Sequence, residues 1–348
     1  MSFGAEMLRS YGEGRKQWKA LMITSAHRPT AAAVNMVGAM CVIGAIDIYV
    51  AVIAQTISVW QFLIMRLLLA APIILALSVM GFGTIRPRRA RAVAFRSTLI
   101  ATGMFCYFGA LAFMPIAMAL AGLFTSPIFV LLLTAFVLRQ RIGPWRIIAV
   151  AVGFAGILVV LGPSGGSLGW VALLPVMGGV LYASGVVATR ALCEGESTLT
   201  LLLGIFVAQG VLGTAVLGLI TMLEVEVGQG GMAFLTRGWI WPLGDAWPYL
   251  LMQVFGSVIG VSMLNRAYQM GEASHVAVFE YSIMIFGPFF GWWLLGQPVT
   301  WVQGAGIALI VLAGVIIAVR SMEAVGLDPR PGAQPGQRPP DLPPEGGH

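Results

Sequence analysis

The sequence predicts an all-α membrane protein, with ten transmembrane helices in two inverted five-helix repeats and both termini cytoplasmic. Three observations lead to this prediction: an apolar composition, a series of long apolar segments, and a weak internal repeat. Hydrophobic residues make up 58% of the 348 residues and charged residues only 10%, whereas a soluble domain carries about 25% charged residues. This composition is typical of a chain that lies in a bilayer.

The apolar segments have the length of membrane-spanning helices. A helix needs about 20 apolar residues to cross the hydrocarbon core, where every backbone polar group must be satisfied internally. The segments do not alternate in polarity as the strands of a membrane β-barrel do. The predicted spans are residues 32–54, 59–80, 97–114, 118–138, 145–161, 169–189, 199–223, 247–269, 274–295 and 301–319.

These spans divide the chain into four parts. Residues 1–30 are polar and basic, lack the apolar core of a signal peptide, and form a predicted cytoplasmic tail. Residues 31–162 and residues 163–322 each hold five spans and form the two predicted repeats. Residues 323–348 are rich in Pro and Gly with little to bury, so a disordered cytoplasmic tail is expected there.

The positions of Lys and Arg predict the orientation. With the N-terminus inside, the predicted cytoplasmic segments hold 18 of the 20 Lys and Arg residues, including a group of five at residues 86–96. Such an asymmetry favours both termini in the cytoplasm. Basic residues beside membrane spans serve topology and contact anionic lipid, so they do not indicate a nucleic-acid partner.

The two halves of the chain resemble each other. Phe124–Ser126 aligns with Phe279–Tyr281 at an offset of 155 residues, and Leu138–Gln140 aligns with Leu295–Gln297 at an offset of 157. Because each half holds an odd number of spans, the two copies must run in opposite orientations. Inverted repeats are the usual design of secondary transporters, although duplication also produces them in channels and scaffolds.

Several short motifs resemble a known family. They are Met114–Ala119, Phe124–Phe129, Leu138–Trp145 and Val152–Gly156 in the first half, and Phe279–Tyr281 and Leu295–Pro298 in the second. Over about residues 32–320 the chain therefore resembles two copies of the EamA-type domain of the drug/metabolite transporter (DMT) superfamily. The resemblance implies a transporter of small organic metabolites. Asp47, Arg66 and Glu280–Tyr281 are most similar to the branch that carries S-adenosylmethionine-type metabolites.

Asp47 and Arg66 are charged residues inside predicted spans. A charge in hydrocarbon costs at least about 2.5–3.5 kcal/mol, so it usually marks a pathway or a buried partner. Asp47 lies about 22 Å along a helix that rises from the cytoplasm, and Arg66 lies about 10 Å down the next helix, at a rise of 1.5 Å per residue. At this matching depth we expect the two residues to pair or to share a hydrogen-bonded cluster. The cluster is either a structural ion pair or a substrate or proton site.

Glu280 lies in the ninth predicted span without a cation at matching depth, apart from His275 near the start of that span. We expect this carboxyl group to take and release protons during transport, and the competing interpretation is a carboxyl hydrogen-bonded to Tyr281 or to a backbone carbonyl. Four tyrosines within spans are further candidates to line a substrate cavity: Tyr49, Tyr107, Tyr182 and Tyr281. Packing against neighbouring helices is the alternative for each tyrosine.

The sequence does not favour an enzyme. Gly162–Gly166 matches the G-x-S-x-G pattern, but it lies in a predicted outer loop, whereas the three histidines are predicted at or near the cytoplasmic side. A Walker motif is impossible, because the only lysines are Lys16 and Lys19. No metal site or cofactor is expected, and the three cysteines form no C-x-x-C motif.

The resulting prediction is a multi-pass secondary transporter of the bacterial inner membrane. It moves a small organic solute, such as an amino acid, an amine or a nucleoside-derived metabolite, by alternating access. Protons are a candidate coupling ion. The sequence is compatible with a homodimer. A membrane scaffold or sensor with the same fold is the competing class. The sequence does not specify the substrate, the direction of transport or the coupling ion.

Overall fold

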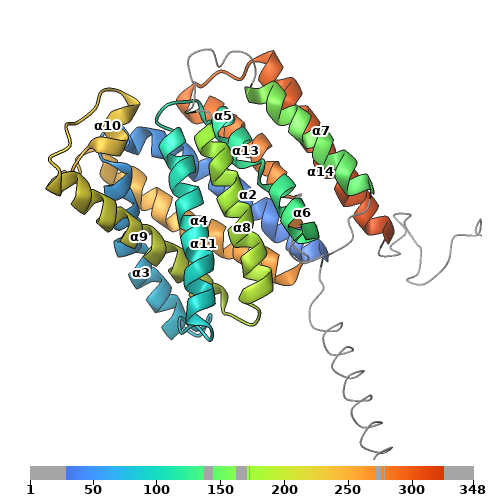
Figure 1. Ribbon diagram of the computed structural model, residues 1–348, viewed down its shortest axis with the longest axis horizontal. Helices are drawn as coiled ribbons and strands as arrows, with labels where there is room; N and C mark the ends of the chain where they lie inside the picture. Colours follow the sequence, from blue (N-terminus) through green and yellow to red (C-terminus); the bar gives the residue numbers. More distant parts are fainter. Residues whose placement is uncertain are drawn as a thin grey trace, which may run out of the picture.

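The computed structural model describes residues 29–136, 144–161, 171, 173–271, 276–277 and 279–324. Every regular element in these residues is a helix (Figure 1). The elements are α2 (Pro29–Ile53), α3 (Val59–Val79), α4 (Ala90–Ala110), α5 (Ile116–Leu123), α6 (Ser126–Phe136), α7 (Pro144–Leu161), α8 (Leu173–Leu192), α9 (Thr198–Met222), α10 (Gly231–Thr236), α11 (Ala246–Met270), the 3-10 turn η3 (Glu280–Ser282), α13 (Ile283–Leu295) and α14 (Trp301–Ala324).

Seven helical stretches are long and apolar enough to cross a membrane: Thr30–Ile53, Val59–Val79, Ala90–Ala110, Ile116–Phe136, Leu173–Leu192, Thr198–Met222 and Ala246–Met270. At the other three predicted positions lie two shorter apolar stretches, Val150–Val159 in α7 and Trp301–Ala313 in α14, and the 13-residue helix α13. The prediction of an all-helical, multi-pass membrane protein is therefore confirmed. Residues 1–28 and 325–348 of the predicted tails lie outside the described residues, as do Leu138–Gln140, Gly162–Gly166 and His275, whereas residues 29–30 belong to α2 and residues 323–324 to α14.

Four helix pairs dominate the packing: α2 with α11, α4 with α8, α3 with α9, and α7 with α14. Small residues let these helices approach closely, as is usual between membrane helices. A Cβ atom added to Gly103 of α4 would lie 2.8 Å from the Gly178 carbonyl oxygen of α8, and one added to Gly178 would lie 2.8 Å from the Gly103 oxygen. The two helices therefore touch backbone to backbone.

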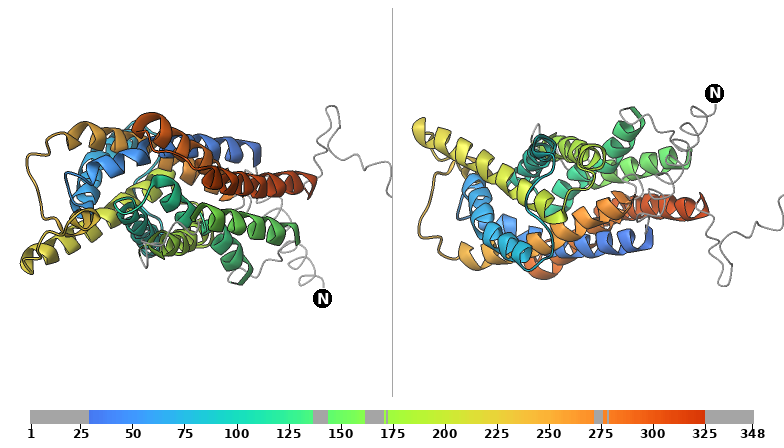
Figure 2. Two further views of the ribbon diagram at one scale, coloured as in Figure 1. Left: turned by 90° about the horizontal axis from the view of Figure 1, so that it is seen from above. Right: turned by 90° about the horizontal axis from the view of Figure 1, so that it is seen from below.

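The pair α7–α14 lies at one edge of the bundle, at the upper right in Figure 1, and Figure 2 shows the same helices from above and from below. The two helices contact each other far more than they contact the remaining helices. Tyr281 contributes to this link, since a Cβ atom on Gly153 of α7 would lie 3.3 Å from the Tyr281 hydroxyl.

Two predicted spans are interrupted rather than continuous. The predicted span 118–138 is divided at Phe124–Thr125 into α5 and α6, where the Thr125 hydroxyl donates to the Gly122 carbonyl and Pro127 opens the second helix. The predicted span 274–295 contains the turn η3 before α13 begins at Ile283. The breaks fall at the residues that the internal repeat aligns, Phe124–Ser126 and Phe279–Tyr281.

The third predicted span was placed too late in the chain. It was predicted at residues 97–114, but α4 runs from Ala90 to Ala110. The early start carries Arg96 into the interior of the bundle, where its side chain is 1% exposed. Arg96 was counted among the cytoplasmic loop cations, and this assignment was wrong because its charge has buried polar partners that hydropathy cannot detect.

Candidate functional site: an enclosed cavity between two polar clusters

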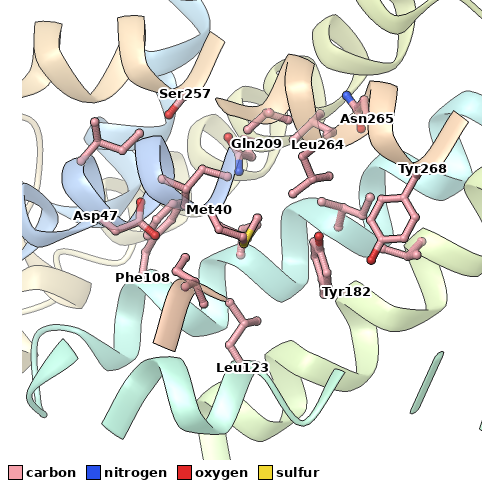
Figure 3. A pocket seen from close by; sticks show the side chains of 18 of the residues that line it. Met40, Asp47, Phe108, Leu123, Tyr182, Gln209, Ser257, Leu264, Asn265 and Tyr268 are labelled. Carbon is pink, nitrogen blue, oxygen red and sulfur yellow. The ribbon is translucent and has the colours of Figure 1, made fainter. Parts of the chain in front are cut away.

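A cavity with about 70 Å³ of free space lies at the centre of the bundle. Helices α2, α3, α4, α5, α8, α9, α11 and α13 all contribute side chains to its wall. Most of the lining is aliphatic or aromatic, and the polar lining residues are Asp47, Arg66, Arg96, Tyr182, Thr189, Gln209, Ser257, Asn265 and Tyr268. Figure 3 shows Asp47 and Ser257 at one end of the cavity, and Asn265, Tyr182 and Tyr268 at the other.

The first end of the cavity holds a hydrogen-bonded chain between Asp47 and Arg66. Gln253 Nε2 donates to Asp47 Oδ1 at 3.1 Å, and the Ser257 hydroxyl donates to Gln253 Oε1 at 2.7 Å. Arg66 Nη2 donates to the same Ser257 oxygen at 2.7 Å. The predicted cluster of Asp47 and Arg66 is therefore present, although an amide and a hydroxyl separate the two charges.

Aromatic rings surround the Arg66 guanidinium. Its central carbon lies 5.3 Å from the ring centre of Phe62, 5.1 Å from that of Phe108 and 5.2 Å from that of Phe206. Such cation–π contacts offset part of the cost of burying the charge. Arg66 Nη1 also donates to Gln209 Oε1 at 3.2 Å. Arg66 is thus held in one position by side chains from three other helices.

The second end of the cavity holds Glu280 behind two tyrosines. The Tyr182 hydroxyl donates to Glu280 Oε1 at 2.8 Å, and the Tyr268 hydroxyl donates to the same oxygen at 2.6 Å. The other oxygen, Oε2, has no hydrogen-bond partner among the described residues. Glu280 is therefore bonded to Tyr182 and Tyr268, and not to Tyr281 as the competing interpretation held.

Arg96 completes the second end and was not among the predicted site residues. Its Nε donates to the Thr189 hydroxyl at 2.7 Å, its Nη1 to the Leu201 carbonyl at 2.9 Å and its Nη2 to Asn265 Oδ1 at 2.8 Å. These acceptors come from α8, α9 and α11. The only sign in the sequence that Arg96 belongs to the helix is that no Pro or Gly separates residue 90 from the apolar stretch that begins at residue 97.

The predicted tyrosines fall in different places. Tyr182 lines the cavity. The buried Tyr107 hydroxyl lies beside Asp47 but makes no hydrogen bond of good geometry. Tyr49 stacks on Tyr249 with ring centres 5.3 Å apart, and Tyr281 packs near Gly153, so neither lines the cavity. Tyr268, a lining residue and a partner of Glu280, was missed by the sequence analysis.

Hydrogen bonds link distant segments at both ends of the bundle. At the α2–α3 end, the Gln61 amide donates to the Ile240 carbonyl at 2.7 Å and accepts from the Ile240 amide at 3.0 Å. Arg237 Nη1 donates to the carbonyls of Ala54 and Ile57 there. We call these contacts the α2–α3 latch.

Glu196 links segments at the opposite end, where the α8–α9 loop meets the start of α4. Its carboxylate accepts from the backbone amides of Arg88 at 3.1 Å and Arg89 at 2.7 Å, which precede α4. Gln269 Nε2 of α11 donates to the Glu196 carbonyl at 2.8 Å. We call these contacts the α8–α9 latch. A carboxylate suits this position because it meets free backbone N–H groups at a helix N-terminus.

Within the described part of the chain, no group of three or more His, Cys, Asp or Glu residues is placed to hold a metal ion. The free space of about 70 Å³ holds a few water molecules, whereas pockets for drug-sized ligands measure about 300–1,000 Å³. The described conformation therefore holds a small, mostly apolar cavity, with hydrogen-bonded contacts between distant segments at both ends of the bundle.

Residues 30–162 and 169–319 each match the model of the EamA-like transporter family. A riboflavin transporter from Rhizobium johnstonii is 29% identical over 227 residues, which cover 65% of this chain and 70% of that protein. A riboflavin transporter from Brucella anthropi is 24% identical over 268 residues, or 75% and 86% of the two chains. An uncharacterized transporter from Helicobacter pylori is 23% identical over 233 residues, covering 67% and 74%.

A solved crystal structure superposes with a TM-score of 0.66 at 17% sequence identity. The superposition covers 85% of this chain and 99% of that chain. At this identity the likeness concerns the fold alone.

Proposed function

We propose that this chain, which belongs to the EamA-like transporter family, is a secondary transporter that carries a flat, uncharged heterocyclic metabolite, riboflavin first among the candidates, by alternating access. As a member of that family it is a multi-pass membrane transporter and not an enzyme, which disfavours a scaffold or sensor. The observation that carries the proposal is the central cavity, because its wall combines aromatic and aliphatic side chains with neutral hydrogen-bonding groups such as Gln209, Ser257 and Asn265.

The cavity suits a ring system better than a strongly charged solute. Phe108, Phe124 and Phe206 contribute aromatic surface, and a flat ring stacks favourably against such side chains. The names of the relatives from Rhizobium johnstonii and Brucella anthropi point to riboflavin. Because the free space is far smaller than riboflavin, the solute must enter a more open conformation than the one described.

We further propose ten spans in two inverted repeats, at residues 31–162 and 163–322, with both termini cytoplasmic. The packing supports this arrangement. If span one corresponds to span six and span three to span eight, the α2–α11 pair maps onto the α4–α8 pair, while α3–α9 and α7–α14 map onto themselves. The matching helix breaks at Phe124–Thr125 and Glu280 also fit two copies, since discontinuous helices flank many transport sites.

In this orientation, the α2–α3 latch faces the outside and the α8–α9 latch faces the cytoplasm. Asp47 and Glu280 then lie near opposite ends of the path. Both are candidates to exchange protons, since each carboxyl lies near the cavity and makes no direct contact with an arginine among the described residues.

An S-adenosylmethionine-type solute is the second candidate. The observation that favours it is the pair of buried carboxyl groups, Asp47 and Glu280, which would attract a cationic solute. Arg66 and Arg96 count against it, because both guanidinium groups line the same cavity.

Uptake into proteoliposomes tests these alternatives. The purified full chain would be reconstituted, and the uptake of riboflavin and of radiolabelled S-adenosylmethionine would be measured with and without a pH gradient, against protein-free vesicles. We expect saturable riboflavin uptake that unlabelled riboflavin abolishes. Uptake of S-adenosylmethionine alone would support the second candidate, and uptake of neither solute would refute both.

A further inference from the structure

Two amide side chains of the cavity share the same arrangement with a buried arginine. Gln209 of α9 and Asn265 of α11 are each 1% exposed and line the cavity. The oxygen of each amide is bound by a buried arginine, Gln209 Oε1 by Arg66 and Asn265 Oδ1 by Arg96. The arrangement occurs once at each end of the cavity.

The arginines fix which way the amides face. A guanidinium group has only donors, so each amide must turn its oxygen toward its arginine and its NH₂ group elsewhere. Arg96 cannot move away, because its other nitrogens are bonded to Thr189 and to the Leu201 carbonyl. Arg66 is likewise held by Ser257 and by the surrounding phenylalanine rings.

The two NH₂ groups are left without protein acceptors. Asn265 Nδ2 is buried and has no hydrogen-bond partner in the described part of the chain. Gln209 Nε2 donates no hydrogen bond to any described residue, and Figure 3 shows the Gln209 nitrogen turned toward the interior of the cavity. A buried donor without an acceptor costs about 1–3 kcal/mol, so an acceptor on the solute gains this energy when it binds.

We propose that Gln209 and Asn265 bind the substrate through their NH₂ groups, each to a carbonyl oxygen of the heterocyclic ring, and that Arg66 and Arg96 are positioning residues that orient these amides. The inference rests on the proposed function and identifies the residues that make the transporter specific for ring carbonyls. Since each amide oxygen faces its arginine, the free NH₂ group is the part of each residue that is left to bind the substrate, and it acts as a donor. A solute without acceptors would leave both donors unpaired, and sites of this kind reject such analogues strongly.

The test uses substitutions that replace the donor with a carboxylate oxygen, and the control adds the same charge elsewhere. Asn265→Asp and Gln209→Glu keep an oxygen for the arginine but replace NH₂ with a second oxygen. Asn35→Asp makes the same exchange in α2, outside the cavity, where the Asn35 amide donates to the Ala31 carbonyl. Binding to the purified full chain would be measured with riboflavin and with lumichrome, which has the same ring carbonyls without the ribityl chain, by quenching of their fluorescence.

We expect both cavity variants to bind riboflavin and lumichrome at least tenfold more weakly than the wild type, and Asn35→Asp to bind them normally. A loss for riboflavin alone would overturn the assignment to the ring carbonyls. Unchanged binding in both cavity variants would overturn the inference altogether. If Asn265→Asp is not monodisperse in detergent, Gln209→Glu tests the same claim at the other end.

A wider panel separates this inference from the proposed substrate. Thermal shifts would be measured with uracil, thymidine and xanthine, which also carry ring carbonyls. If the wild type binds one of these but not riboflavin, and the cavity variants lose that binding, then riboflavin is refuted and the inference stands. If the wild type binds no carbonyl-bearing heterocycle, both are refuted.

The positioning role of Arg96 has a separate readout. Arg96→Lys keeps the charge but cannot hold three acceptors in the same plane. We expect the KM for the transported heterocycle to rise at least fivefold with Vmax changed less than twofold, because a misplaced amide weakens binding. A fall in Vmax at unchanged KM would instead indicate a structural role and overturn the positioning role.

Discussion

Four buried charged residues define the chemistry of the cavity at the scale of single side chains. Asp47, Arg66, Arg96 and Glu280 are all at most 3% exposed. Each is surrounded by amides, hydroxyls or rings, and no two of them are in direct contact. A solute does not easily separate two charged side chains that contact each other directly. Charged side chains that are joined through neutral groups keep hydrogen-bonding capacity for a substrate or a proton.

Glu280→Gln tests the proton role. Glutamine keeps an oxygen that accepts from Tyr182 and Tyr268 but cannot bind or release a proton. We expect uptake by the variant to proceed at the same rate with and without a pH gradient, whereas uptake by the wild type responds to the gradient. The measurement is the initial rate in proteoliposomes at several internal and external pH values.

Glu194→Gln is the matched control, since Glu194 is exposed beside the α8–α9 latch. It should retain the wild-type response to pH. Retention of the full response by Glu280→Gln would exclude Glu280 as the coupling group and leave Asp47 as the candidate.

Arg96→Met tests how much the buried Arg96 side chain contributes to the stability of the fold. The substitution removes three hydrogen bonds and leaves the Leu201 carbonyl and Asn265 Oδ1 without their donor. We expect the free energy of unfolding to fall by about 2 kcal/mol or more, because buried acceptors remain unpaired. Thermal unfolding in detergent measures the change, with Arg91→Met, an exposed arginine of the same helix, as the control. A melting temperature of Arg96→Met equal to that of Arg91→Met would contradict the result.

At the scale of helices, the sequence predicts what depends on local composition. Spans such as Val59–Val79 and Thr198–Met222 match their predicted positions within about one residue, because apolar length alone specifies them. The start of α4 was missed, since the burial of Arg96 depends on acceptors in three other helices. The break at Glu280 was also missed, because the apolar composition of residues 274–295 does not signal the turn η3. The shared cluster of Asp47 and Arg66 could be predicted from the sequence, because the depth of each residue in the membrane follows from its position along the helix.

Gly178→Val tests the close contact between α4 and α8. A Cβ atom at this position meets the Gly103 carbonyl oxygen at 2.8 Å and Cys106 at 3.4 Å. The larger side chain must separate the two helices, and overpacking of this kind costs about 1–3 kcal/mol. We expect a lower melting temperature and weaker binding, because both helices line the cavity. Gly218→Val is the control, as Gly218 has open space around it, and equal melting temperatures for the two variants would contradict the predicted contact.

At the scale of the whole molecule, the proposed alternating access requires the molecule to open toward each side in turn. The cavity is too small for the proposed solute, so we expect each half of the proposed cycle to break one latch and keep the other. Each latch contains only a few hydrogen bonds, worth about 0.5–1.5 kcal/mol each. Their balance therefore sets the populations of the outward-open and inward-open states, because an energy difference of this size shifts a two-state equilibrium severalfold.

Breaking one latch at a time should bias the molecule in a direction that the proposed orientation specifies. Gln61→Leu removes both bonds to Ile240, and Glu196→Ala removes the acceptor of the Arg88 and Arg89 amides. A reporter thiol at Val261, which lines the cavity, would be introduced after replacing Cys41, Cys106 and Cys193 with Ala. We expect Gln61→Leu to raise the rate of labelling by a membrane-impermeant maleimide about fivefold from the outside, and Glu196→Ala to raise it similarly from the cytoplasmic side.

Gln229→Leu is the control, since Gln229 is exposed in the loop before α10, and it should change neither rate. Labelling from the opposite sides would invert the proposed topology, and unchanged labelling in both variants would mean that the latches do not control access. Because the two variants act at opposite ends on one reporter, the direction of the change reports the orientation and its size reports the strength of each latch.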